Sequence, residues 1–146
     1  MTVGSANVGL RGGNRAGDRT AHNSDPPKAT IAVLDDDLLF RASIARNLRS
    51  AGYDVIEVEE EAELAAALAE FPVDLILADS RLADGSDGWL VAKRLSELHG
   101  AIPWLAMTSY DSDAIVHLGG IDVPHVVKQG AGMNVIGAVE DALSKR

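Results

Sequence analysis

Short apolar runs alternate with amphipathic segments from Ala29 to the end of the chain. The apolar runs predict five strands, at 31–34, 53–58, 74–79, 103–108 and 123–128. Helical spacing and breaks at Gly or Pro predict five helices, at 38–50, 60–70, 89–99, 111–118 and 133–144. Strands that alternate with helices are typical of βαβ units. The pattern therefore predicts an α/β fold, a doubly wound five-stranded parallel sheet with five helices.

The runs at 31–34, 74–79 and 103–108 are almost continuously apolar. A strand with one wet face alternates apolar and polar residues, so continuous runs indicate strands that helices cover on both faces. Trp104 lies in one of these runs, and we expect it in the core. Trp89 opens the helix predicted at 89–99, close to the loop that follows the third strand.

The first 28 residues differ from the rest. They are rich in Gly, Asn, Ser and Arg, show no lasting period and close with Pro26 and Pro27. Such a segment has too little apolar surface to offset the entropy of ordering its backbone. The sequence therefore predicts a disordered tail at 1–28 and one domain at 29–146.

Composition narrows the class of protein. The chain has 146 residues, of which 47% are apolar, enough for one domain with a real core. It has no cysteine, so it can form neither a disulfide nor a thiolate metal site. No apolar run approaches the ~18 residues of a membrane span. No apolar core of a signal peptide opens the chain, so we expect a cytoplasmic protein.

The net charge of −9 is unevenly spread. Residues 1–28 carry 4 basic and 2 acidic residues, whereas residues 29–146 carry 9 basic and 20 acidic residues. Contacts to phosphate backbones need Lys and Arg, so direct binding of nucleic acid is not expected of this domain. The acidity suits a protein that binds cations or docks on basic surfaces.

Charged and hydroxyl side chains gather where the predicted strands end. Ligands of open parallel sheets bind at this edge, beside the carboxyl ends of the strands. The residues that stand there are Asp35, Asp36 and Asp37 after the first strand, Asp79 at the end of the third, Thr108 and Ser109 at the fourth, and Lys128 at the fifth. If the first and third strands are neighbours, at least three carboxylates converge and repel one another unless a cation lies among them.

The residue types decide which cation and which chemistry to expect. Oxygen ligands without Cys or a nearby His favour Mg²⁺ or Mn²⁺ over Zn²⁺. Mg²⁺ takes one or two carboxylates together with phosphate oxygens, so acids, a hydroxyl and a lysine at one edge predict a phosphoryl site. For any single aspartate the alternative is simpler, because Asp after a strand commonly caps the next helix. We expect this capping role for Asp37.

Four motifs in this order resemble the receiver domain of two-component response regulators. They are IAVLDDD at 31–37, LILADSRLADGSDG at 75–88, LAMTS at 105–109 and HVVKQ at 125–129. The resemblance covers about residues 29–146. It implies a flavodoxin-like sheet with strand order 2-1-3-4-5. Each motif alone is weak, but their order and spacing together are specific.

The resemblance also implies roles for individual residues. Asp79 would accept a phosphoryl group from a histidine kinase or a phosphotransfer protein. Asp36 would bind Mg²⁺ directly, with help from Asp35 through water, from Asp79 and from the backbone carbonyl of Arg81. Thr108 and Lys128 would be the catalytic partners of Asp79, and Thr108 and His125 would be the switch residues. Such a protein catalyses its own phosphorylation and dephosphorylation and is a switch rather than a turnover enzyme.

The sequence departs from the family pattern at four places. Gln129 follows Lys128 where the family usually has proline. The loop after Asp79 has one extra residue, with Ala83 at the usual proline position. His125 stands at the aromatic switch position, and Ser109 replaces a smaller residue. None of these changes removes a chemical group, so altered rates or partners are expected.

We predict a stand-alone receiver without a DNA-binding domain. It would signal through its fourth helix, fifth strand and fifth helix, a face that includes His117, Leu118, Ile121 and Val126. One alternative is a pseudo-receiver that binds a partner without phosphorylation. A second is a Mg²⁺-dependent hydrolase of the haloacid-dehalogenase type, which would use Asp35 and Asp37 and would leave Asp79 without a role.

Overall fold

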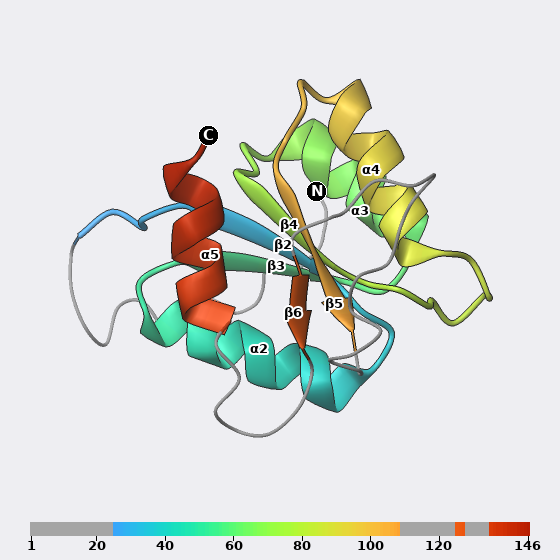
Figure 1. Cartoon of the computed structure of the whole chain (residues 1–146), viewed down its shortest axis with the longest axis horizontal. Coiled ribbons are helices and arrows are strands. Elements are labelled where there is room, and N and C mark those ends of the chain that lie inside the picture. The colour runs from blue at the N-terminus through green and yellow to red at the C-terminus, as the bar shows by residue number, and fades with distance from the viewer. Residues whose placement is uncertain (1–24, 109–124, 128–134) are drawn as a thin grey trace.

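The computed structural model describes residues 25–108, 125–127 and 135–146. Strands and helices alternate along this part of the chain (Figure 1). The strands are β2 (Thr30–Leu34), β3 (Asp54–Val58), β4 (Leu75–Asp79), β5 (Trp104–Thr108) and β6 (His125–Val127). The helices are α2 (Leu38–Ser50), α3 (Glu61–Glu70), α4 (Gly88–Leu98) and α5 (Val135–Ser144). The helix predicted at 111–118 lies outside the described residues, as do residues 1–24 of the tail predicted at 1–28.

The five strands form one parallel sheet in the order β3-β2-β4-β5-β6. This is the order 2-1-3-4-5 expected from the resemblance. Strand β2 lies between β3 and β4, and Leu34 pairs with Val58 on one side and with Ala78 on the other. The first and third strands of the chain are therefore neighbours, as the convergence of the aspartates requires.

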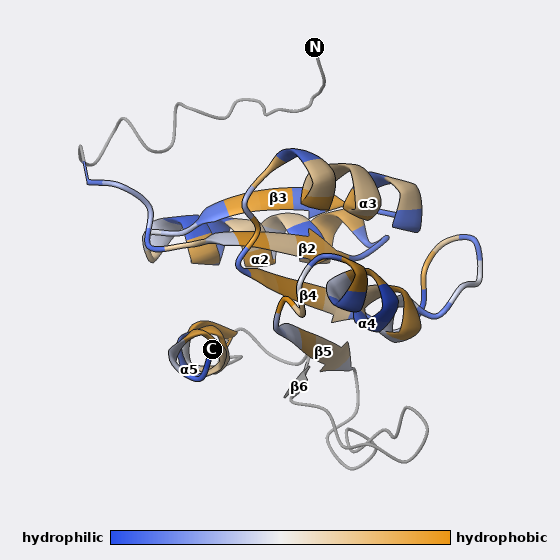
Figure 2. Cartoon of the chain, turned by 90° about the horizontal axis from the view of Figure 1, so that it is seen from above, coloured by the Kyte–Doolittle hydropathy of each residue, from blue (hydrophilic) through white to orange (hydrophobic). Residues whose placement is uncertain are grey.

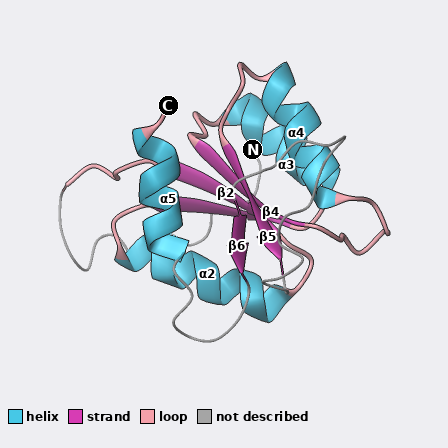
Figure 3. Ribbon diagram, in the orientation of Figure 1, coloured by secondary structure: helices cyan, strands magenta, loops and turns pink. Residues whose placement is uncertain are grey.

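Helices cover both faces of the sheet (Figure 3). On one face, Ala32 and Ile76 of the sheet pack with residues of α3 and α4, including Leu64 and Leu95. On the other face, Val33 and Leu77 pack with residues of α2 and α5, including Ile44 and Val139. Successive residues of β2 and β4 point to opposite faces. Because helices cover both faces, both sets of residues are buried. This is why these runs are continuously apolar, as Figure 2 shows for β2 and β4.

Local chemistry sets the ends of the elements within one or two residues of the prediction. Helix α4 begins at Gly88 because Asp87 caps it, accepting from the N–H groups of Trp89 and Leu90. Strand β3 begins at Asp54, after Tyr53 donates its N–H to the carbonyl of Leu48 at the end of α2. No helix in the described part of the chain is long and apolar enough to cross a membrane.

Candidate metal and phosphoryl site

Three aspartates meet at the carboxyl edge of the sheet. Asp35 follows β2, Asp36 comes next, and Asp79 is the last residue of β4. One carboxylate oxygen of each lies within 4.8 Å of those of the other two. The pairing of Leu34 with Ala78 places Asp35, the residue after β2, level with Asp79 at the end of the adjacent strand β4. The predicted convergence of Asp35, Asp36 and Asp79 is therefore confirmed.

The three carboxylates lie at different depths. Asp35 is fully buried, Asp79 is partly buried and Asp36 is exposed. Asp35 is held through its backbone, because its N–H donates to the carbonyl of Val58 at 3.1 Å. One of its carboxylate oxygens accepts the N–H of Asp37 at 3.0 Å. The site therefore has a buried wall at Asp35 and an open side at Asp36.

The carboxylate of Asp37 takes no part in the cluster. Asp37 is the N-cap of α2, and its carboxylate accepts the N–H of Phe40 at 3.1 Å. The capping role expected from the sequence is confirmed. A hydrolase of the haloacid-dehalogenase type would need Asp37 beside Asp35 as a catalytic acid. The carboxylate of Asp37 instead closes the first turn of a helix.

The donor set suits a hard divalent cation. Three carboxylate oxygens this close repel one another strongly when only partly hydrated. Mg²⁺, Mn²⁺ and Ca²⁺ prefer oxygen ligands of this kind, whereas Zn²⁺ favours Cys and His, which are absent from the described cluster. The residues present therefore fit a magnesium ion.

The loop after Asp79 folds back on itself. Arg81 and Asp87 form an antiparallel bridge, flanked by hydrogen bonds from Leu82 N–H to Ser86 O at 3.0 Å and from Gly88 N–H to Ser80 O at 2.9 Å. In such a pair the flanking residues make the hydrogen bonds, so the bridge leaves the backbone carbonyl of Arg81 unused. The loop between Ser80 and Gly88 is thus closed as a tight turn.

A side-chain contact closes the same turn. Asp84 accepts hydrogen bonds from both the hydroxyl and the backbone N–H of Ser86, and these bonds lower the pKa of its carboxyl group. The side chain of Leu82 is buried in the core on the α3–α4 face. The loop is therefore anchored at its base and closed at its tip.

The start of α4 presses on the end of β4. A Cβ atom on Gly88 would lie 2.0 Å from the backbone carbonyl oxygen of Asp79, so only glycine fits there. The indole N–H of Trp89 donates to the carbonyl of Ala78 at 2.9 Å, and this side chain is 4% exposed. Trp104, which was expected in the core, is only partly buried. The backbone on either side of the Asp79 carboxylate is thus fixed by α4.

The remaining predicted site residues are placed only in part. Thr108 ends β5, the strand next to β4, and is buried. Asp79 pairs with Met107, so Thr108 lies one residue farther along the same edge. His125 is the first residue of β6. Lys128, Ser109 and Gln129 lie outside the described residues, as do His117, Leu118 and Ile121 of the predicted docking face.

Comparison with known families agrees with this arrangement. Residues 31–128 match the model of the response regulator receiver domain. The chain belongs to this family. This match confirms the resemblance noted in the four motifs. Receiver domains are phosphoacceptor switches of two-component signal transduction.

Curated relatives are longer than this receiver. It is 34% identical over 90 residues to the DNA-binding transcriptional regulator NtrC of Escherichia coli K12. The match covers 61% of this chain and only 19% of that protein. The matched part of the chain therefore spans about a fifth of the length of that relative.

Solved structures show the same fold. The N-terminal domain of a response regulator/sensory box/GGDEF protein from Carboxydothermus hydrogenoformans matches with a TM-score of 0.68 at 24% identity, over 80% of this chain and 94% of that one. A response regulator from Burkholderia pseudomallei with a phosphorylated aspartic acid, calcium ion and citrate matches with a TM-score of 0.62 at 22% identity, over 80% of this chain and 66% of that one.

One residue of the receiver escaped the sequence prediction. The guanidinium group of Arg41, from the first turns of α2, donates to the backbone carbonyl of Asp35 at 2.7 Å. A signal was present, because Arg41 stands three, four and seven residues before Ile44, Ala45 and Leu48 on the buried face of the helix. A charge on that face calls for buried partners, and the sequence did not show which they are.

Proposed function

We propose that this receiver accepts a phosphoryl group on Asp79 from a histidine kinase or a phosphotransfer protein, with Mg²⁺ bound beside it. The observation that carries the proposal is the meeting of Asp35, Asp36 and Asp79 at the carboxyl edge of β2 and β4. A carboxylate is a competent nucleophile for phosphoryl transfer, and Asp79 is the member of the cluster at the end of a central strand.

The transfer needs little covalent chemistry from the protein. A carboxylate oxygen of Asp79 attacks the phosphorus, an acyl phosphate bond forms, and the bond from phosphorus to the donor nitrogen breaks. The electron pair stays on that nitrogen, which then takes up a proton. Bound Mg²⁺ would neutralise charge on the phosphoryl oxygens. Its ligands would be Asp35, Asp36, Asp79 and the backbone carbonyl of Arg81.

Residues close to Asp79 would respond to its phosphorylation. Thr108 would donate its hydroxyl proton to the new phosphoryl group, Lys128 would pair with its charge, and His125 would be the switching ring. These movements would change the docking surface formed by the fourth helix, the fifth strand and the fifth helix of the fold, where Val126 lies. We propose that the receiver at 29–146 acts on a protein partner in this way.

Two observations support the proposal, the first for a protein donor and the second for the chemistry. Large apolar side chains are exposed where α2 and α4 begin, beside the cluster: Leu38 is 62% exposed, Leu39 81% and Leu90 48%. Exposed leucines at the rim of a charged site suit a partner that must approach Asp79 closely. The Burkholderia response regulator, by its description, carries a phosphorylated aspartic acid and a calcium ion, which is the chemistry proposed for Asp79 and its cation.

The proposal is tested by mass. The intact protein is incubated with Mg²⁺ and acetyl phosphate, and its mass is compared with that of Asp79→Ala and of Asp84→Ala, an exposed aspartate of the next loop. We expect one added phosphoryl group in the wild type and in Asp84→Ala, none in Asp79→Ala, and none when the metal is chelated. An unmodified wild type would favour the pseudo-receiver, which binds its partner without phosphate.

A further inference from the structure

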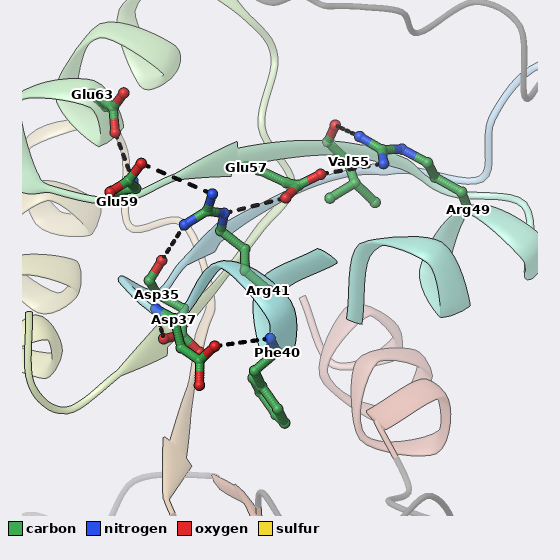
Figure 4. Close-up of polar contacts among 9 residues, drawn as sticks. All are labelled: Asp35, Asp37, Phe40, Arg41, Arg49, Val55, Glu57, Glu59 and Glu63. Carbon is green, nitrogen blue, oxygen red and sulfur yellow. Dashed lines mark hydrogen bonds and ion pairs between the residues drawn. The ribbon is translucent and has the colours of Figure 1, made fainter. Parts of the chain in front are cut away.

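A buried arginine, Arg41, contacts the backbone of the candidate cation site at the carbonyl of Asp35. Arg41 is 6% exposed, and its guanidinium group has three partners (Figure 4). It donates to the carbonyl of Asp35 at 2.7 Å and to the carboxylate of Glu57 at 3.2 Å, and lies 4.0 Å from the carboxylate of Glu59. One planar group therefore joins α2, the end of β3 and the loop that carries the acidic cluster.

We propose that Arg41 is a positioning residue for the cation site. The carbonyl of Asp35 belongs to the peptide unit that links Asp35 to Asp36. Holding this carbonyl fixes the orientation of that peptide plane, and with it the directions in which both carboxylates leave the backbone. Since Asp35 N–H is already held by Val58, the guanidinium group fixes the other side of the residue. This inference rests on the proposed function of the cluster.

The charge of Arg41 is compensated on the side away from the metal. Glu57 accepts from Arg41 and also lies 3.4 Å from Arg49, and Glu59 is the second carboxylate near Arg41. The two arginines and two glutamates sum to no net charge. A bare positive charge behind the cluster would compete with Mg²⁺. Because this charge is balanced, the effect of Arg41 on the cation is mainly geometric.

The partners of Arg41 are themselves held in place. Arg49 donates to the carbonyl of Val55 at 3.0 Å and to the carboxylate of Glu57 at 3.4 Å, so it holds the Glu57 side chain along β3. Glu59 donates its N–H to the carboxylate of Glu63 at 2.6 Å, at the start of α3. Outer partners that orient metal ligands commonly change metal affinity 10–100-fold when they are removed.

Arginine is the residue that this arrangement requires. Its planar fork donates in several fixed directions at once, whereas the ammonium group of lysine is a compact charge on a flexible stem. Lysine at position 41 could reach Asp35 or Glu57 but would not hold both in the same geometry. The conservative substitution should therefore fail in part, which a simple requirement for positive charge would not predict.

The test uses three substitutions on one helix. Arg41→Met removes the donors and keeps the stem, Arg41→Lys keeps the charge, and Arg46→Met is the matched control, because Arg46 is exposed on α2. The dissociation constant for Mg²⁺ is measured by calorimetry on the whole chain, after urea unfolding has shown each variant to be folded. Hydrogen exchange of residues 35–37 is measured without metal.

We expect Mg²⁺ binding to weaken about tenfold or more in Arg41→Met, by an intermediate factor in Arg41→Lys, and by less than about twofold in Arg46→Met. In the metal-free protein, exchange at 35–37 should become faster in both Arg41 variants and stay unchanged in Arg46→Met. A residue that only ties α2 to β3 would lower the stability and leave the affinity of the folded protein unchanged.

The outcomes separate the two proposals. A wild type that binds Mg²⁺ together with a folded Arg41→Met that binds it equally well overturns the role of Arg41 and leaves the proposed function standing. A wild type without Mg²⁺ binding overturns both. If Arg41→Met does not fold, Arg41→Lys decides: wild-type affinity and wild-type exchange at 35–37 overturn the inference.

Discussion

An aspartate stands at each end of strand β4, and the two have different surroundings. Asp74 precedes β4, and both of its carboxylate oxygens accept from donors: Thr30 N–H at 2.9 Å and the guanidinium group of Arg146 at 2.8 Å. Asp79 ends β4, and its carboxylate lies among those of Asp35 and Asp36. The residue type is the same and the strand is the same. Only the end of the sheet differs.

The difference follows from what each edge offers. At the amino edge, the first N–H of β2 needs an acceptor, and the C-terminal residue supplies a cation, so Asp74 is satisfied within the chain. At the carboxyl edge, the helix N-termini offer N–H groups, but Asp37 and Asp87 already cap α2 and α4. The cluster of three carboxylates there suits a cation from outside the chain.

The largest expected difference between the two edges comes from replacing one glycine at each of them. Gly88 at the carboxyl edge has no room for a Cβ atom beside the carbonyl of Asp79. Gly88→Ala should lower the free energy of unfolding by about 3 kcal/mol or more, because a backbone atom must shift. It should also slow phosphoryl acceptance by Asp79 in the mass assay.

Gly52 at the amino edge is the matched position. Its φ is +102°, and a Cβ atom there meets only the flexible side chain of Lys28. Gly52→Ala should cost about 1–2 kcal/mol of backbone strain in urea unfolding and leave phosphoryl acceptance unchanged. Equal effects of the two substitutions on acceptance would break the distinction between the edges.

Magnesium should stabilise the protein through one edge only. At about 100 times its dissociation constant, Mg²⁺ should raise the free energy of unfolding by about 2.7 kcal/mol in the wild type. Asp36→Asn should lose most of this increment and be more stable than the wild type without metal, because a repelling charge is gone. Urea unfolding with Mg²⁺ and with a chelator checks both.

Asp74→Asn is the control at the other edge. It should lose about 1–2 kcal/mol whether or not Mg²⁺ is present, since it weakens hydrogen bonds to a charged group. The Mg²⁺ increment should remain at its wild-type size. An increment lost in Asp74→Asn would mean that the cation does not act through the carboxyl-edge cluster.

The smallest expected effect on stability appears at alkaline pH and comes from Tyr53, at the amino edge of the sheet. Burial, and then the charge of Glu140, raises the pKa of Tyr53 above its ordinary value. Between the two pKa values the unfolded chain loses this proton first, so the folded state binds more protons and stability falls as pH rises above ~10. The slope is at most ~1.4 kcal/mol per pH unit.

Tyr53→Phe removes this contribution. The stability difference between wild type and Tyr53→Phe should therefore be constant below pH ~10 and shift against the wild type above it. Urea unfolding of both proteins from pH 8 to pH 11 measures the shift. Parallel curves over the whole range would show that Tyr53 titrates alike in both states.

Much of the fold could be predicted because its signals are local. The apolar run at 31–34 and the helical spacing of Ile44 and Leu48 each reflect a periodicity that a short window contains. The meeting of Asp35 with Asp79 needed one further assumption, that their strands are neighbours. The degree of burial of the two tryptophans was beyond such reasoning, because it depends on which elements pack against them.

The spacing of apolar and polar residues along the chain was enough to predict the alternation of strands and helices, the buried faces, and the acidic and hydroxyl residues at the strand ends that the structure describes. The partners of these groups could be learned only from the folded chain. It placed Arg41 under Asp35, Gly88 against Asp79 and Arg146 on Asp74, contacts between residues 6, 9 and 72 positions apart. Periodicity within an element fixes which face is buried, whereas the direction of a long side chain depends on elements that the chain brings together only when it folds.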